Sequence, residues 1–290
     1  GWYLCLQLLE KNYEVIATGK GECRLPFLQE KNFTYLPMDF TDPFAVHDVF
    51  EKCSPGIVIH AGAMSKPDEC ELLQWEAFRT NVEGTITLLN NAEEKQCFFV
   101  FLSTDFIFDG KQGMYREEDI PGPVNYYGKT KWEAEQAVQE YMHEWAIVRT
   151  VLVYGKSHGG RGNLLTVVKE KLEKKESYQV FNDQQRTPTY VEDLAAGIIA
   201  VIEKRAHGIY HISGEECLTP YEMACRAADW LGLDKSLLGK VTAADFSQPA
   251  IRPLKTGFSI EKAGRDLDYR PCSFKEGLAK TFSEIISIKI

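Results

Sequence analysis

Tyr127 and Lys131 are the two residues of this sequence that most directly suggest acid–base chemistry. They stand four positions apart in a segment typical of the start of a helix, so both side chains project from one face about a turn apart. A phenol is a weak acid with a pKa of about 10, and a neighbouring ammonium group lowers that pKa. The pair therefore predicts proton donation from Tyr127 to a carbonyl oxygen. An isolated pair of this spacing is usually two solvent-facing side chains, so the prediction depends on its surroundings.

A cluster of polar residues precedes this pair along the chain. Ser103, Thr104 and Asp105 directly follow an apolar run at 98–102, and open α/β sheets bind ligands at the carboxyl ends of their strands. Thr104 is therefore expected to hydrogen-bond the carbonyl oxygen that Tyr127 protonates. The same three residues equally suit a turn or a helix cap. It is their combination with the Tyr–Lys pair that favours chemistry.

The segments that must position these residues alternate between strands and helices. Short apolar runs of the kind seen in strands covered on both faces lie at residues 14–18, 33–36, 57–61, 98–103 and 146–150. Asp42 and Pro43 supply a helix cap and a proline at the first helical position. Such alternation predicts parallel strands joined by right-handed crossovers. The expected fold is α/β, with a doubly wound Rossmann-type parallel sheet in residues 1–155.

In the second half of the chain, strand-like and helix-like segments alternate less regularly. The segment from Gly155 to Gly162 is rich in glycine and predicts a mobile loop. Helices are expected at 191–204 and 221–231, and a strand at 209–212. We interpret residues 156–290 as a smaller α/β substrate-binding domain that caps the carboxyl ends of the sheet. Its segments are expected to interleave with the first domain.

Several stretches together resemble the extended short-chain dehydrogenase/reductases, and among them the dTDP-4-dehydrorhamnose reductase family. They lie at residues 58–63, 81–85, 102–110, 115–119, 127–131, 186–194 and 252–253. The resemblance implies that Thr104, Tyr127 and Lys131 form a catalytic triad. In it Tyr127 is the general acid, Lys131 tunes it and holds the nicotinamide ribose, and Thr104 orients the substrate carbonyl.

The resemblance also implies a dinucleotide site. Gly1 matches the last glycine of the phosphate-binding motif, whose first strand and earlier glycines are expected to precede it, although a glycine unrelated to the motif is the alternative. The remaining candidates are an adenine contact, Asp39 and Phe40, and a close-approach segment, Ala61, Gly62 and Ala63.

Two cations bear on which dinucleotide is bound. No acid ends the second strand of the expected fold, and Lys20 and Arg24 follow it. Cations there favour NADPH, whose 2′-phosphate they would bind, with NADH as the alternative. Two solvated surface cations are an equally good interpretation.

Substrate candidates are Ser65, Thr104, Asp105, Arg186 and Arg252. A nucleotide-sugar substrate carries two phosphate charges, which suits arginine, although ordinary salt bridges are the default for both arginines. The resemblance implies a 4-keto-6-deoxy nucleotide sugar, dTDP-4-dehydro-L-rhamnose, reduced to dTDP-L-rhamnose. Arg186 and Leu152 replace residues usual in that family, a small residue and a tryptophan, so the exact sugar stays open.

Two other functions remain in view. Residues 115–121, 184–186 and 221–225 resemble the regulatory β subunit of methionine adenosyltransferase, which keeps the fold and a dinucleotide site but acts as a binding partner. The hydroxyl of Thr104 favours catalysis over that alternative. An epimerase or dehydratase is the third interpretation: Asp105 partly resembles the acidic residue of the dehydratases, whereas Arg252 and Pro253 favour simple reduction.

Composition excludes some classes of protein. A net charge of -9 argues against non-specific nucleic-acid binding. The sequence has no apolar run long enough to cross a bilayer and no visible signal peptide, so no membrane association and a cytoplasmic location are expected. The eight cysteines form no C-x-x-C pair and are expected to be reduced thiols. We predict no metal site, with His60 and His211 as core histidines. Whether the chain forms a homodimer stays open.

Overall fold

The computed structural model describes residues 1–158, 162–246 and 248–283. Its parallel strands form an α/β fold, as the sequence predicts. A four-stranded sheet has the order β3-β4-β5-β9, with β3 at Ile57–His60, β4 at Phe98–Thr104, β5 at Trp145–Thr150 and β9 at Gly208–His211. β1 at Val15–Gly19 pairs in parallel with β2 at Phe33–Pro37 as a separate sheet. Three residues of the expected mobile loop, 159–161, lie outside the described residues.

β1 and β3 differ from the central strands because each pairs on one side only among the described strands. Ile57, Val58 and Ile59 of β3 are consequently only partly buried, and so is most of β1. Six of the seven residues of β4 are buried, as are five of the six of β5. β3 is nevertheless packed on both faces, as predicted, because Val58 contacts one hydrophobic core and Ile57 and Ile59 contact another.

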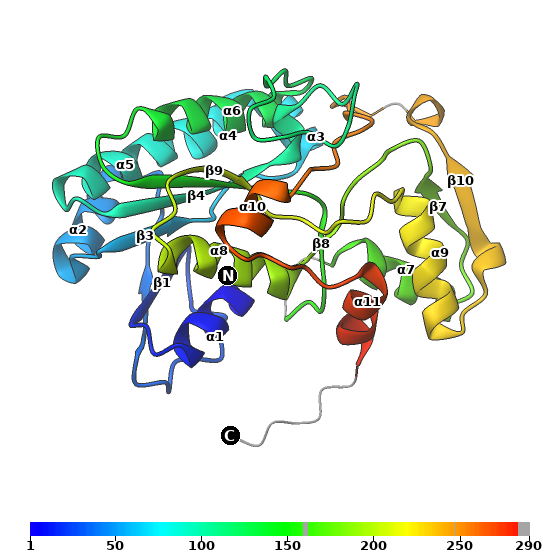
Figure 1. Cartoon of the computed structure of the whole chain (residues 1–290), viewed down its shortest axis with the longest axis horizontal. Coiled ribbons are helices and arrows are strands. Elements are labelled where there is room, and N and C mark those ends of the chain that lie inside the picture. The colour runs from blue at the N-terminus through cyan, green and yellow to red at the C-terminus, as the bar shows by residue number, and fades with distance from the viewer. Residues whose placement is uncertain (159–161, 247, 284–290) are drawn as a thin grey trace.

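Helices cover both faces of the sheets (Figure 1). One face carries α2 at Pro43–Cys53, α5 at Gly84–Glu94 and α6 at Tyr126–Gln139, and the other carries α1 at Trp2–Glu10 and α8 at Val191–Glu203. Successive residues of β4 face opposite sides: Phe99 and Phe101 join the α2–α5–α6 core, while Phe98 and Val100 join the α8 core.

Local signals in the sequence explain where two of these helices begin. Asp42 accepts hydrogen bonds from the backbone of Phe44 and Ala45 at 3.0 and 3.4 Å, with Pro43 at the first helical position, as predicted. α6 is capped by Asn125, whose side chain accepts from the Gly128 backbone at 2.9 Å. The route from β3 to α5 runs through α3 at Pro67–Leu72, α4 at Gln74–Phe78 and a π-helical turn η1 at Arg79–Glu83.

Beyond β5 the chain builds a smaller cluster and returns to the first sheet. The cluster holds β6 at Val153–Tyr154 with β8 at Thr189–Tyr190, β7 at Tyr178–Phe181 with β10 at Leu238–Val241, α7 at Leu164–Glu173, α9 at Pro220–Leu231 and α11 at Phe274–Phe282. Short turns lie at η2 Asp105–Ile107, η3 Lys235–Leu237 and η4 Ala243–Asp245. α8, β9 and α10, at Glu261–Asp266, pack against the sheet of the first half through Leu194, Tyr210 and Ala263. No described helix is both long and apolar enough to cross a bilayer.

Candidate active site

The carboxyl end of β4 and the start of α6 meet at one place. Gly128 makes this contact possible, because a Cβ atom there would lie 2.1 Å from the carbonyl oxygen of Phe106 in η2. The rings of Phe106 and Tyr127 pack edge to face with centroids 5.7 Å apart. Thr104, the last residue of β4, accepts a hydrogen bond from the Phe106 backbone at 3.3 Å. A residue without a side chain thus lets α6 bring Tyr127 to the end of β4.

The side chain of Thr104 lies near enough to Tyr127 to lower the pKa of the phenol. Burial raises the pKa of Tyr127 above its usual value, and the effect of Thr104 offsets only part of the rise. The other groups that act on the phenol are Asp105 and Cys70, which raise its pKa further. The sequence predicts a pKa lowered by Lys131, and that expectation is wrong for this structure. Tyr127 therefore keeps its proton at neutral pH, which suits a proton donor.

The direction of the Lys131 side chain explains why Lys131 does not lower the pKa of Tyr127. Its ammonium group donates a hydrogen bond to the carbonyl oxygen of Leu102 at 2.8 Å and lies 3.8 Å from the ring centroid of Phe101. Burial lowers the pKa of Lys131 to about 7, while the Glu135 carboxylate opposes the decrease. Its charge is thus only partial near neutral pH, and its ammonium is directed at the end of β4.

Asn81 is a site residue that the sequence reasoning did not single out. It is 1% exposed and lies in the π-helical turn η1. Its side chain bonds both backbone groups of Met64, at 2.8 and 3.0 Å, and donates to the Thr130 hydroxyl at 2.9 Å. Asn81 therefore ties the segment after β3 to the helix that carries Lys131. A π-helical turn often marks a functional site, but residue types alone do not reveal one.

The residues expected at a dinucleotide lie at the carboxyl end of β3 and around it. Ala61 is exposed, and Gly62 and Ala63 are partly so. A Cβ atom on Gly62 would lie 2.6 Å from the ring of Phe40, so the ring and the backbone pack closely. Phe40 is thereby shown as a packing residue of this segment. Gly1 directly precedes α1 and accepts the first bond of that helix, from Cys5 at 2.9 Å.

The two expected phosphate-binding cations have different surroundings. Lys20 follows β1 and pairs with Asp39 at 2.8 Å, with 64% of its side chain exposed. Asp39 also accepts bonds from the backbone and hydroxyl of Thr41. Burial raises the pKa of Asp39, but the bonds from Lys20 and Thr41 outweigh it and leave the pKa below its usual value. Arg24 is exposed, and none of the described residues forms an ion pair with it. Both cations are accessible to an anionic ligand.

Arg186, expected to bind substrate, is 4% exposed and surrounded by acceptors. Its Nη atoms donate to the carbonyl oxygens of Gln185, Leu254 and Pro253 and to the Gln184 amide oxygen, at 2.7 to 3.3 Å. Its Nε lies 3.5 Å from Asp105. Each Nη atom thus donates to two acceptors within the protein and Nε lies at ion-pair distance from Asp105, so a phosphate would have to displace protein acceptors to bind.

Asp105 and Arg252 are also committed to protein partners. Asp105 accepts hydrogen bonds from Thr104 at 3.2 Å and from Thr256, and burial raises its pKa despite Arg186. Arg252 grips both oxygens of Asp68 at 2.7 and 2.8 Å and is only 14% exposed. Of the four candidates outside the triad, Ser65 alone is exposed. The structure brings Asp105 to Thr104 and assigns both arginines to holding backbone segments and carboxylates in place.

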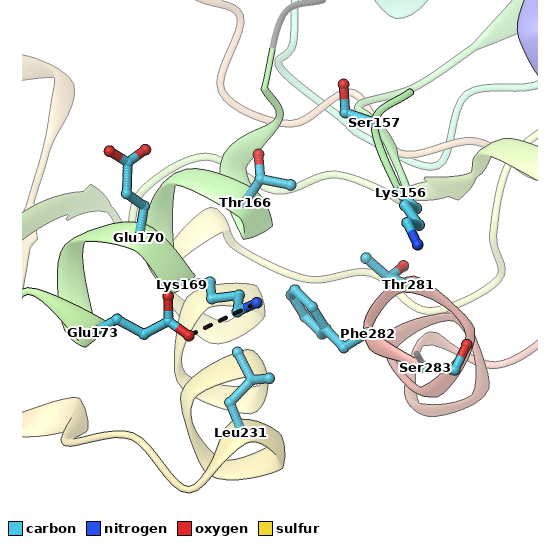
Figure 2. A pocket seen from close by; sticks show the side chains of 10 residues that line it. All are labelled: Lys156, Ser157, Thr166, Lys169, Glu170, Glu173, Leu231, Thr281, Phe282 and Ser283. Atoms are coloured by element: carbon cyan, nitrogen blue, oxygen red, sulfur yellow. Dashed lines mark ion pairs between the residues drawn. The ribbon is translucent and has the colours of Figure 1, made fainter. Parts of the chain in front are cut away.

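A pocket lies apart from these residues, between α7, α9 and α11 (Figure 2). Lys156 and Phe282 border it, and Lys169 on its wall pairs with Glu173 at 3.7 Å. It contains none of the predicted site residues. Elsewhere, the ligand atoms of His47, Glu51 and Glu94 lie within 4.8 Å of one another on the exposed surface, where Glu51 pairs with Lys95 at 2.6 Å. His60 and His211 are buried core residues, as predicted.

Comparison with known proteins agrees with this geometry. A family model described as "RmlD substrate binding domain" matches residues 1–287. The solved structure of dTDP-4-dehydrorhamnose reductase from Bacillus anthracis str. Ames in complex with NADP superposes with a TM-score of 0.83 at 28% identity, over 92% of this chain and 97% of that one. The fold and the resemblance inferred from sequence motifs are therefore confirmed.

Two curated relatives differ in what their names say. Methionine adenosyltransferase 2 subunit beta of Pongo abelii is 34% identical over 239 residues, which cover 80% of this chain and 69% of that protein. The spore coat polysaccharide biosynthesis protein SpsK of Bacillus subtilis (strain 168) is 31% identical over 288 residues, covering 98% of this chain and 93% of that one. Similarity alone thus leaves an enzyme and a subunit as candidates.

Proposed function

The chain belongs to the RmlD substrate binding domain family, and on that premise we propose that it is an NADPH-dependent reductase. The proposed substrate is a 4-keto-6-deoxy nucleotide sugar, dTDP-4-dehydro-L-rhamnose, and the product is dTDP-L-rhamnose. The observation that carries the proposal is the close packing of the start of α6 against the end of β4, which brings Tyr127 to Thr104, with Lys131 one helical turn further on. The NADP-bound relative supports the choice of cofactor.

The residues present fit a dinucleotide. The exposed backbone at Ala61 leaves room for a ligand beside the end of β3, and Lys20 offers an exposed cation for a ribose 2′-phosphate. When bound, NADPH would supply the hydride for the carbonyl carbon. Lys131 would hold the nicotinamide ribose, and Lys20 with Arg24 would select the phosphate.

The chain's own residues then handle the proton. Tyr127 keeps its proton because burial raises its pKa, and it donates that proton to the carbonyl oxygen as negative charge develops there. Thr104 orients the carbonyl through its hydroxyl. Lys131, one helical turn away, stays bonded to the Leu102 carbonyl oxygen, and its role in the proposal is to hold the nicotinamide ribose.

The test is oxidation of NADPH, followed by absorbance, with enzymatically generated dTDP-4-dehydro-L-rhamnose. Tyr127→Phe is expected to lower kcat by at least about 100-fold, the usual contribution of a positioned acid. Tyr126→Phe is the matched control, since it removes a hydroxyl from the neighbouring position on the same helix, and is expected to keep turnover. Full turnover by Tyr127→Phe would refute the mechanism.

A second candidate follows from the 34% identity to methionine adenosyltransferase 2 subunit beta. In that case the chain would bind a dinucleotide and serve as a non-catalytic partner of a methionine adenosyltransferase. Dinucleotide binding without turnover on any keto sugar, together with a stable complex with a methionine adenosyltransferase catalytic chain, would favour it. Turnover that depends on Tyr127 would exclude it as the sole function.

A further inference from the structure

A fully buried ion pair lies one helical turn beyond Lys131. Arg149 on β5 and Glu135 on α6 have side chains that are 1% and 0% exposed. Arg149 contacts both carboxylate oxygens: Nε lies 3.0 Å from Oε1 and 3.2 Å from Oε2, and Nη2 lies 2.7 Å from Oε2. This two-point contact fixes where the carboxylate lies.

Arg149 is itself held from its other side. Its Nη1 donates to the carbonyl oxygen of Glu117 at 3.3 Å and lies 3.4 Å from Nε2 of His211. The ring of His211 in turn stacks on Phe258, with centroids 3.9 Å apart. The guanidinium is therefore fixed between a loop, a strand and the helix that carries Glu135.

The spacing of Lys131 and Glu135 on α6 would allow an ion pair between them, but they do not pair directly. Residues four apart on a helix lie next to each other on its surface, and a buried carboxylate needs a cation. In this structure Arg149 meets that need, while the Lys131 ammonium bonds the Leu102 carbonyl oxygen at 2.8 Å instead.

We infer that Arg149 is a positioning residue that holds the Glu135 carboxylate away from Lys131, so that the Lys131 ammonium stays bonded to the Leu102 carbonyl oxygen near the carboxyl end of β4. Without the grip of Arg149, Glu135 would swing one turn along α6 and pair with Lys131. The catalytic consequence of this arrangement rests on the proposed function, whereas the pairing itself does not.

The charges around Lys131 support this arrangement. Burial lowers the pKa of Lys131 to about 7, and Glu135 opposes the decrease. Across from it, burial and then Lys131 lower the pKa of His60 on β3 to about 3, so His60 is neutral at physiological pH. Of the described charged groups, Glu135 is therefore the one that favours the ammonium form. A direct Lys131–Glu135 contact would raise the pKa of Lys131 and draw its ammonium from Leu102.

The test is a pH titration of the Lys131 side chain by NMR in lysine-labelled protein, with the signal assigned by its loss in Lys131→Arg. Arg149→Met is expected to raise the Lys131 midpoint by about one pH unit, as a new opposite charge within contact does. Adding Glu135→Gln to Arg149→Met is expected to bring the midpoint back near the wild-type value. Arg149→Lys keeps the buried cation but loses the two-point grip, and is expected to shift the midpoint in the same direction if Arg149→Met does not fold.

Arg205→Met is the matched control, because it breaks an exposed arginine–glutamate pair, with Glu144, whose side chains are both 57% exposed. It is expected to leave the midpoint unchanged. An unshifted midpoint in the folded Arg149 variants, or a shift that Glu135→Gln does not reverse, would overturn the inference. Because this signal is read without turnover, absence of reductase activity would refute the proposed function and leave this result standing. Where turnover exists, kcat should fall in Arg149→Met and recover in the double variant.

Discussion

Two buried arginine–carboxylate pairs flank the proposed catalytic residues, and they are built differently. Arg149 contacts both oxygens of Glu135 at 2.7 to 3.2 Å, on the helix that carries Lys131. Arg186 approaches Asp105, the residue after Thr104, only at 3.5 Å, and donates its other N–H groups to neutral oxygens. In the first pair the arginine hydrogen-bonds mainly to the carboxylate, whereas in the second it hydrogen-bonds mainly to backbone carbonyl oxygens.

The difference shows that a buried arginine can either neutralise a buried carboxylate or hold backbone segments together through their carbonyl oxygens. Glu135 and Arg149 neutralise each other, so removing either one would leave the other as an uncompensated buried charge. Asp105 shares its oxygens with the hydroxyls of Thr104 and Thr256, and burial raises its pKa despite the arginine. Arg186 thereby connects the 253–256 segment of the second half to the end of β4. In the first pair the arginine compensates the charge of Glu135, and in the second it joins two parts of the chain.

The largest effect is expected for Arg186→Met. It leaves Asp105 without its cation and deprives the carbonyl oxygen of the buried Pro253 of its donor, so the free energy of unfolding should fall by at least about 3–5 kcal/mol. Urea unfolding measures this loss. Adding Asp105→Asn should restore little of it, because the Pro253 carbonyl oxygen stays without its donor, whereas adding Glu135→Leu should restore most of the stability lost in Arg149→Met. Equal recovery in both double variants would remove the distinction between the pairs.

A smaller effect is expected in the pH dependence of stability. Because the pKa of Asp105 is raised, the folded chain keeps a proton that the unfolded chain loses at about pH 4. The free energy of unfolding should therefore decrease with rising pH, from about pH 4 to the folded pKa, relative to Asp105→Asn. Asp68→Asn is the contrasting control, since Arg252 lowers the pKa of Asp68 and its contribution should instead be lost as pH falls. A wild-type advantage over Asp105→Asn that grows with pH would show that Arg186 compensates Asp105 after all.

The smallest effect on stability is expected for the exposed pair of Lys20 and Asp39. Lys20→Ala should change the free energy of unfolding by less than about 1 kcal/mol, because solvent screens the pair. It should nevertheless weaken NADPH binding relative to NADH by about tenfold, the value of one charge-assisted contact. Isothermal titration with both dinucleotides tests this, with Lys11→Ala, another exposed lysine in an ion pair, as control. An unchanged preference would mean that Lys20 serves Asp39 alone.

Local patterns predicted most of the fold. The expected strands and the helices at 43, 191 and 221 agree with the structure to within about two residues, because apolar runs, caps and prolines act through neighbours in sequence. The burial of β1 and β3 was overestimated, because burial depends on which strands lie alongside and not on the composition of a strand.

The sequence by itself determined the α/β class, the strand-end Thr104 and the helical spacing of Tyr127 and Lys131, since these depend on periodicity and on residues close in the chain. Only the tertiary structure decided which carboxylate each arginine meets. It turned the expected substrate arginines Arg186 and Arg252 towards protein acceptors, and it placed Asn81 at the site. The physical reason is that a cation binds whichever acceptor packing brings within about 3 Å, and packing joins residues that are far apart in sequence.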